Sequence, residues 1–188
     1  MKKMNVILMV PILALFTACV FESNVPGHDG KDGDSFLGTV FEIEGDFTAS
    51  NDWSLYFKFP VTFEVFESDV VLVYILWDQV TDKFGKVQDV WRLLPQTVAL
   101  SEGILQYNFD YTLNDVEIFL GGTIDLHTLL PAESKDQVFR IVVLPADFAM
   151  ENSLDLNNFG LILKSLSIPA ETIKRLDLTE TKPTDAFK

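Results

Sequence analysis

Carboxylates offer the widest choice of chemistry in this sequence. The chain has 188 residues, 28 of them Asp or Glu, and a formal net charge of −14. Two closely spaced pairs, Glu42 with Glu44 and Glu64 with Glu67, contain the residue types that a glycosidase uses as acid and as base or nucleophile. Acids that alternate along a strand are equally typical of a solvated sheet face. A carboxylate-dependent glycan hydrolase is therefore an alternative function that the sequence leaves open.

Other catalytic groups lack the partners they need. His127 is the only His outside a glycine-rich segment near the N-terminus, and no Gly-X-Ser-X-Gly elbow accompanies it. The single Cys excludes an internal disulfide and a Cys-based zinc cluster. The acidic balance argues against nucleic acid as a partner, because Lys and Arg bind the phosphates. We therefore predict that the protein is not an enzyme and requires no cofactor.

Calcium is the one metal for which the sequence offers ligands. Residues 93–134 contain no Lys or Arg but several acids, and Asn114, Asp115 and Glu117 are closely spaced within them. Calcium takes oxygen ligands and tolerates loop geometry, so these three side chains are calcium candidates. The alternative is an acidic surface that keeps the protein soluble.

Aromatic side chains are the other candidates for a binding site. Trp53 and Tyr56 lie at the start of an alternating stretch, and both have rings that can stack on sugars. Tyr56 shares a strand face with Lys58, which indicates that its ring points outward. Rings at strand positions more often belong to the core. The sequence thus names Tyr56 and Trp53 as ligand aromatics and leaves a core role as the alternative.

Residues 1–18 have the plan of a secretory signal peptide. Lys2 and Lys3 form a basic start, and an apolar stretch follows over 6–16, interrupted by Pro11. A helix that spans a membrane needs about twenty apolar residues, so the stretch is too short to span. It predicts export.

The only Cys follows this stretch directly. Leu15, Phe16, Thr17, Ala18 and Cys19 together resemble a bacterial lipobox, although Phe16 stands where Leu is usual. The resemblance implies cleavage before Cys19 and the attachment of diacylglycerol and palmitate to that residue. Two or more acyl chains anchor a protein stably to a membrane.

The residues after the Cys bear on location. Val20 stands where an Asp retains lipoproteins at the inner membrane, which favours the outer membrane. Glu22 is the only acid close behind, whereas surface-exported lipoproteins of Bacteroidota usually carry an acidic cluster there. The sequence therefore predicts an outer-membrane lipoprotein and leaves the periplasmic or cell-surface leaflet undecided.

A glycine-rich spacer completes the segment 19–35. Gly27, Gly30 and Gly33 stand at period three, as in collagen. Three triplets are too few to hold a triple helix alone, so we expect an extended, hydrated tether. A trimerising stub is the alternative, and the oligomeric state stays open.

With these features the chain resembles the small collagen-like lipoproteins of Bacteroidota, of the flavobacterial type. The resemblance covers the lipobox, the Gly-X-Y stretch and a β-rich domain with segments 67–74, 90–97, 105–110 and 138–148. It implies a location and an architecture and carries no assigned activity.

The rest of the chain predicts one β-rich domain, residues 36–188. Alternating or continuous apolar stretches predict strands at 38–44, 53–63, 70–77, 90–94, 105–112, 116–120, 138–144 and 175–178, with a polar hairpin loop at 78–89. One helix is expected where Leu156, Phe159, Leu163 and Leu166 share a face. The fold class is mainly β, an antiparallel sandwich, Ig-like or related, with one short C-terminal helix. A closed or partly closed barrel is the alternative.

These features together predict a lipid-anchored binding or structural module of the bacterial envelope. Its acyl chains would contact the membrane, and its domain would bind an envelope protein or a glycan. A glycan hydrolase remains the competing class.

Overall fold

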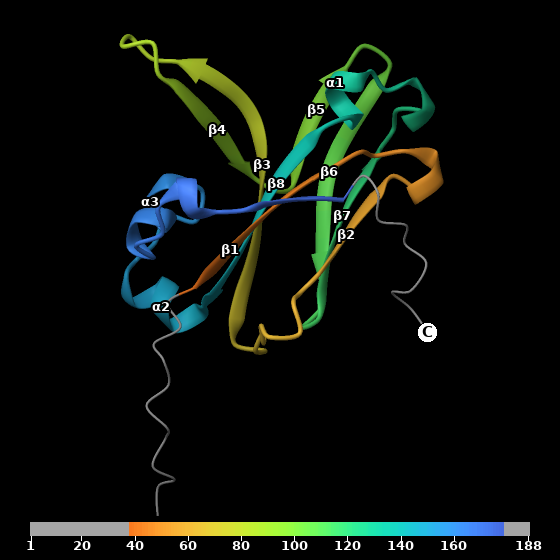
Figure 1. The fold of residues 1–188 in the computed structure, drawn as a ribbon. Helices are drawn as coiled ribbons and strands as arrows, with labels where there is room; N and C mark the ends of the chain where they lie inside the picture. The colour runs from red at the N-terminus through yellow and green to blue at the C-terminus, as the bar shows by residue number, and fades with distance from the viewer. Residues whose placement is uncertain (1–37, 179–188) are drawn as a thin grey trace, which may run out of the picture. The chain divides into compact units, whose positions relative to one another are not determined.

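The computed structural model describes residues 38–178, which form two β-sheets with few helices. One sheet has five strands in the order β4-β3-β8-β1-β9, and the other has four in the order β2-β7-β6-β5 (Figure 1). The strands are β1 (Thr39–Gly45), β2 (Ser54–Lys58), β3 (Asp69–Thr81), β4 (Val87–Leu93), β5 (Gln96–Leu100), β6 (Gly103–Tyr111), β7 (Asp115–Gly122), β8 (Gln137–Pro145) and β9 (Arg175–Asp177).

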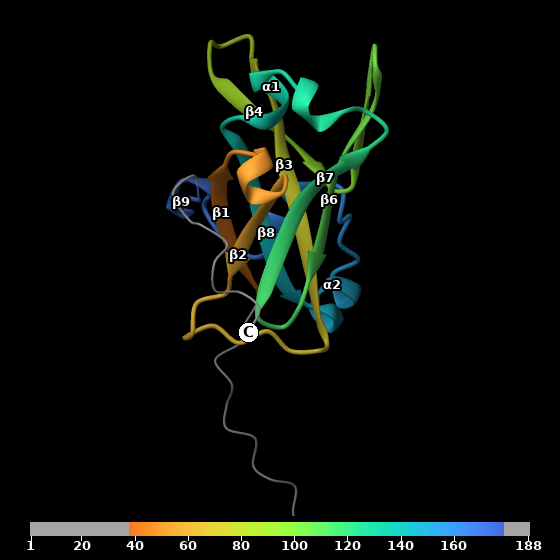
Figure 2. The ribbon, with the colours of Figure 1, turned by 90° about the vertical axis from the view of Figure 1, so that its right-hand side faces the viewer.

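The two sheets pack face to face, which confirms the predicted β-sandwich. Figure 2 looks from the side of β2, β6 and β7, behind which β3 and β8 lie. Within residues 38–178 no strand belongs to both sheets, so the closed-barrel alternative is wrong. Neighbouring strands are antiparallel, with one difference from the prediction: β9 runs parallel to β1 at the sheet edge.

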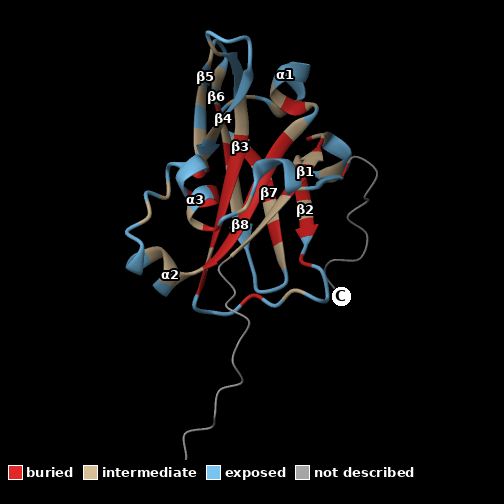
Figure 3. Ribbon diagram, turned by 60° about the vertical axis from the view of Figure 1, so that its left-hand side comes forward, coloured by how far each residue is buried: buried red, intermediate tan, exposed pale blue. Residues whose placement is uncertain are grey.

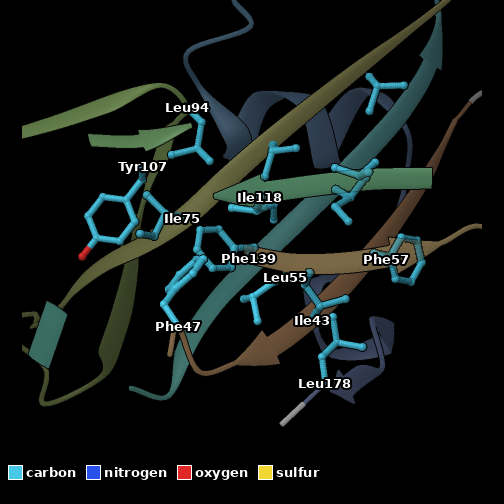
Figure 4. Packing of buried hydrophobic residues seen from close by; sticks show 14 of the residues in the cluster. Ile43, Phe47, Leu55, Phe57, Ile75, Leu94, Tyr107, Ile118, Phe139 and Leu178 are labelled. Atoms are coloured by element: carbon cyan, nitrogen blue, oxygen red, sulfur yellow. The ribbon is translucent and has the colours of Figure 1, made fainter. Parts of the chain in front are cut away.

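The inner faces of the two sheets make the main core. Ile43, Phe139 and Ile141 come from the five-stranded sheet, and Leu55 and Ile118 come from the four-stranded one, all less than 4% exposed. Figure 4 shows these layers meeting, with Ile43, Leu55 and Phe139 close together. Alternation along each strand sends every second side chain into this space, which is why the period-two pattern located the strands.

The five-stranded sheet is covered on its outer face as well. Leu72, Val142 and Leu144 of that face pack against Phe159 and Ile162 of α3 (Phe159–Ser165). Figure 3 shows the resulting burial, which is heaviest along β3 and β8. The continuous apolar runs of these strands are explained by this double covering, as predicted for central strands.

The helices differ from the single one that was predicted. Besides α3, the described residues form α1 (Pro131–Ser134), α2 (Ala146–Glu151) and the short 3-10 turns η1 (Ala49–Asn51), η2 (Leu126–Thr128) and η3 (Ala170–Thr172). The predicted helix begins later than its apolar pattern, because Asn158 caps it by accepting the Leu161 amide. Leu156 lies before the helix, where its carbonyl accepts the Tyr74 hydroxyl.

The predicted loop at 78–89 is wrong, because most of it is strand. β3 continues to Thr81 and β4 begins at Val87, so only five residues make the turn. β8 pairs with β3 no further than Ile75, and the register of β3 with β4 shifts between Leu76 and Asp78. Residues 78–90 therefore form a two-stranded ribbon, here called the hairpin arm, which extends away from the body of the sheet (Figure 1).

The alternating stretch 53–63 is strand only in its first half. Leu55, Phe57 and Phe59 are buried as predicted, whereas Val61 is fully exposed. β2 ends at Lys58, and Pro60 follows. A proline has no amide hydrogen for a ladder, so the strand stops where the proline stands.

Candidate functional site

The predicted anchor lies outside the described residues. This applies to the signal peptide 1–18, to Leu15, Phe16, Thr17, Ala18 and Cys19, and to the spacer that ends at residue 35. Among the helices that the structure describes, none has the length and apolar character needed to cross a membrane.

Tyr56 lies on the open outer face of the four-stranded sheet. Its hydroxyl donates a hydrogen bond of 2.6 Å to Glu117 Oε1 on the neighbouring strand, and Asp110 lies opposite Glu117 on the next one. The hydrogen bond to Glu117, helped by burial, raises the pKa of Tyr56 to about 12. A hollow of only about 70 Å³ lies here, and Tyr111 and Asp115 also line it. The structure thus brings Tyr56, Asp115 and Glu117 together in a shallow, acidic depression.

Two of the three calcium candidates, Asp115 and Glu117, accept hydrogen bonds from neighbouring side chains. Thr112 Oγ1 donates to Asp115 Oδ1 at 2.7 Å and accepts the Asn114 amide at 3.0 Å, which builds the turn between β6 and β7. Glu117 accepts a hydrogen bond from the Tyr56 hydroxyl and takes no part in the hydrogen bonds of this turn. No group of three or more His, Cys, Asp or Glu side chains that could hold a metal occurs within residues 38–178.

Trp53 lies at the border of the main core and contacts it. It is half-buried and packs against the main core, and its ring meets the His127 ring edge-on with centroids 5.5 Å apart. Its backbone φ of 56° lies in the left-handed region, just before β2 begins. Trp53 and Tyr56 therefore do not form one aromatic platform.

The predicted carboxylate pairs do not converge on a cleft. Glu42 is 5% exposed, and both of its oxygens accept from guanidinium groups: Oε2 from Arg140 and Oε1 from Arg175, each at 2.7 Å. Arg175 also binds Glu44 at 2.7 Å. Glu64 and Glu67 are exposed in the connection between β2 and β3. A carboxylate whose two oxygens both accept from arginines is engaged in ion pairs, which suits a structural role better than acid catalysis.

A much larger cavity lies on the outer side of the five-stranded sheet, beside β4. Its volume is about 690 Å³, and we call it the β4 pocket. It is lined by Lys86, Val87, Gln88, Asp89 and Trp91 of the hairpin arm and β4, by Arg140 of β8, and by Asp155, Asn157, Asn158, Phe159, Gly160, Leu163 and Ala170. No local pattern in the sequence predicts this site.

Arg140, the cation on the sheet side of the β4 pocket, belongs to a polar row that crosses the five-stranded sheet. Tyr74, Arg140, Glu42 and Arg175 are cross-strand neighbours in β3, β8, β1 and β9. The Arg140 guanidinium carbon lies 4.1 Å from the centre of the Trp91 ring and 5.0 Å from that of Phe159. Cation–π contacts and the ion pair with Glu42 together hold this charge in place.

The lining of the β4 pocket suits recognition of a neutral, polar ligand. Two cations, Lys86 and Arg140, face two carboxylates, Asp89 and Asp155. The amides of its polar residues can both donate and accept, and Trp91 adds a half-buried aromatic surface. Ligand sites commonly combine an aromatic and apolar base with a few polar groups, as here. Trp91, one of the rings that the sequence offers for stacking on sugars, is the sequence feature that lies at this site.

Comparison with known proteins gives no relative. No protein-family model matches the chain, and neither the curated proteins nor the solved structures contain a significant match.

Proposed function

We propose that the protein is a lipid-anchored binding module of the bacterial outer membrane, and that the β4 pocket is its binding site. The acyl chains at Cys19 hold it on the membrane. The folded domain presents the β4 pocket to an envelope component, and no catalytic step is part of this function.

The size and chemistry of the β4 pocket carry this proposal. Its volume of about 690 Å³ falls within the usual range for ligand sites, whereas the depression beside Tyr56 has only about 70 Å³. Arg140, which lines the pocket, is 7% exposed and clamped by Glu42 and two rings. A preorganised base of this kind lowers the entropic cost of binding.

The position of the hairpin arm is consistent with an N-terminal anchor. The described chain enters the sheet at Thr39, which is in register with Val143 of β8 and, through it, with Val71 of β3. β3 ends at Thr81, ten residues beyond Val71, or about 33 Å along the strand. Figure 1 shows the arm and the start of β1 at opposite ends of the sheet. The chain therefore enters the described domain at the end of the sheet opposite the arm.

The anchoring is tested by fractionating cells that express the full chain. The wild-type protein is expected in the outer membrane with a mass that includes acyl chains, and Cys19→Ala is expected in the soluble fraction without them. Phe16→Leu, which restores the usual lipobox residue, is the matched control and is expected to stay lipidated. Membrane-bound Cys19→Ala protein without acyl chains would refute the anchor. Protease treatment of intact cells then decides the leaflet.

A glycan hydrolase is the second candidate, on one observation. Asp89 and Asp155 line the β4 pocket from two different segments, one on the edge strand and one before α3. Glycan turnover that both Asp89→Asn and Asp155→Asn abolish would establish this activity. Binding of the intact glycan without turnover would leave the module a binder.

A further inference from the structure

We propose that the β4 pocket takes an extended polypeptide segment of a partner protein, which adds to β4 as a sixth strand of the five-stranded sheet. This inference rests on the proposed function, because it names the class of partner that the same pocket binds.

The backbone of β4 offers hydrogen-bonding groups on its outer edge. The Asp82 amide donates to the Lys86 carbonyl, and the Leu94 amide donates to the Val73 carbonyl of β3. Bonded and non-bonded pairs alternate in an antiparallel ladder, so the even-numbered residues of β4 face β3. Val87, Asp89 and Trp91 then direct their N–H and C=O groups away from β3. β4 is the end strand of its sheet, so no further strand takes up these groups among residues 38–178.

The β4 pocket follows this edge. Four consecutive residues, Lys86 to Asp89, line it together with Trp91. Consecutive residues of a strand point to opposite faces, so a cavity that touches Val87, Gln88 and Asp89 reaches the strand's edge, while Arg140 and Phe159 extend it over the outer face of the sheet. The stretch from Lys86 to Trp91 is about 17 Å long, enough to pair with about five residues of an extended chain.

The other edges of the two sheets are less suited to strand addition. β9 has three residues, and β2 and β5 have five each, whereas β4 has seven. Proteins usually protect long edges with prolines, bulges or charges. β4 contains no proline, but it carries Asp89 and Arg92, and its pairing with β3 shifts register between Leu76 and Asp78. Val80 and Val87, on the two strands of the hairpin arm, are 48% and 55% exposed. Two-stranded ribbons are marginally stable alone, so a third strand would stabilise the arm.

The chemistry of the pocket specifies the segment. Residues 38–178 carry nine Lys and Arg against 22 Asp and Glu, whereas the pocket lining holds Lys86 with Asp89 and Asp155, and its second cation, Arg140, is already ion-paired with Glu42. A backbone strand is neutral and needs paired donors and acceptors, which matches this lining. Its side chains alternate, so every second one faces Trp91, Phe159 and Leu163. The expected partner segment is therefore extended and has apolar residues at alternate positions.

The probe is a phage-displayed library of random twelve-residue peptides, selected on the purified protein. Selected peptides are expected to alternate apolar and polar residues and to bind as free synthetic peptides. Hydrogen exchange then reports the mode of binding. The amides of Val87 and Asp89 are expected to exchange at least tenfold more slowly with peptide bound. Those of Gln88 and Val90, already bonded to β3, are expected to change little.

Two pairs of variants separate strand addition from a general loss of structure. Gly160 lines the pocket, and an added Cβ would meet only Asn158 Oδ1 at an ordinary 3.5 Å. Gly160→Trp is expected to weaken peptide binding at least tenfold by filling the pocket, and Gly160→Ala, which adds a single methyl group, to weaken it much less. Asp89→Pro removes an outward amide, while Asp89→Ala removes the same carboxylate and keeps the amide. Only the proline is expected to abolish binding, with thermal unfolding of both variants cooperative.

Other outcomes overturn the inference in distinguishable ways. An oligosaccharide array that binds the wild type but not Gly160→Trp, with no peptide selected, would make the ligand a glycan and leave the proposed function standing. A dimer in sedimentation that Asp89→Pro dissociates would make the added strand a second copy. Peptides that bind Gly160→Trp and wild type equally would remove the β4 pocket from both proposals.

Discussion

The two sheets have outer faces of opposite character. The four-stranded sheet leaves its outer face open, with Tyr56, Glu117 and Asp110 in a row near the β6–β7 turn. The five-stranded sheet carries an ionic row that includes Arg140 and Glu42, and covers it with α3. Both rows follow from the same alternation, which sends polar residues outward. The difference lies in whether a second layer then excludes water from them.

This difference in solvent access determines which polar contacts contribute most to the stability of the fold. Water can solvate Glu117 if its partner is removed, so the contact with Tyr56 contributes little. Glu42 is 5% exposed, so its charge depends on protein partners alone. The covered face also gains a pocket, because the covering segments leave a space beside β4 that a bare sheet cannot have. The predictions below test this contrast.

The largest expected effect comes from Arg140→Met. It removes one of the two cations that hold Glu42, and we expect the free energy of unfolding to fall by about 3 kcal/mol. Glu117→Gln on the open face is the counterpart and is expected to cost less than about 1 kcal/mol. Denaturant unfolding of both variants measures the contrast. Equal losses would mean that the covering layer does not exclude water from the ionic row.

A second contrast concerns the room around two glycines. Gly122, at the end of β7, has a φ of 128°, and an added Cβ would lie 2.0 Å from the Ile104 carbonyl oxygen. Gly122→Ala is therefore expected to destabilise the fold by about 1–3 kcal/mol. Gly160, in α3, has room for a methyl group, and Gly160→Ala is expected to stabilise by up to about 1 kcal/mol. Thermal unfolding of the two alanine variants checks the opposite signs.

On the open face, we expect a smaller effect from the titration of the Tyr56 hydroxyl. Its pKa is raised to about 12 because the phenol donates to Glu117, so the folded state favours the protonated form. The stability from this bond is present below pH 10 and is lost as the pH rises through about 12. NMR titration of the Tyr56 ring checks the value. Glu117→Gln should return the pKa toward 10, and an unchanged pKa would show that Glu117 is not its cause.

The smallest effect is expected at the turn of the hairpin arm. The Asp82 carboxylate accepts the amides of Lys86 and Phe84, and these hydrogen bonds hold its pKa below the ordinary 3.8. The bonds are present above that value and are lost as the pH falls through the lowered pKa. The amide shifts of Phe84 and Lys86 should titrate together in that range. Asp82→Asn should abolish the titration, and shifts that follow another group would contradict the assignment.

The sequence predicted the layers of this fold better than its details. The alternation from Leu105 to Tyr111 predicted β6, and the continuous apolar run from Val138 to Leu144 predicted β8. In both cases the pattern of apolar and polar residues within the strand itself reflects whether one or both of its faces are buried. The start of α3 was missed, since the side chain of Asn158 and not the apolar period decides it. β5 was missed because it is short and half-exposed.

The β4 pocket could not be predicted in the same way. Its lining comes from β4, from Arg140 and from the segment 155–170, which lie far apart in the chain. The polar sequence 78–89 indicated a loop, although β3 continues into it as far as Thr81 and β4 begins within it at Val87. The outward direction of the Tyr56 ring was predictable because the alternation of a single strand determines it. A site that depends on tertiary packing leaves no such local pattern.

The central claim is that binding occurs on the covered face at β4 and not on the open face at Tyr56. NMR shift mapping of the full chain, with solubilised outer-membrane extract as the titrant, tests it most directly. We predict changes at Val87–Trp91 and Asp155–Gly160, which Gly160→Trp suppresses. Changes centred on Tyr56, Asp110 and Glu117, unaffected by Gly160→Trp, would contradict the account.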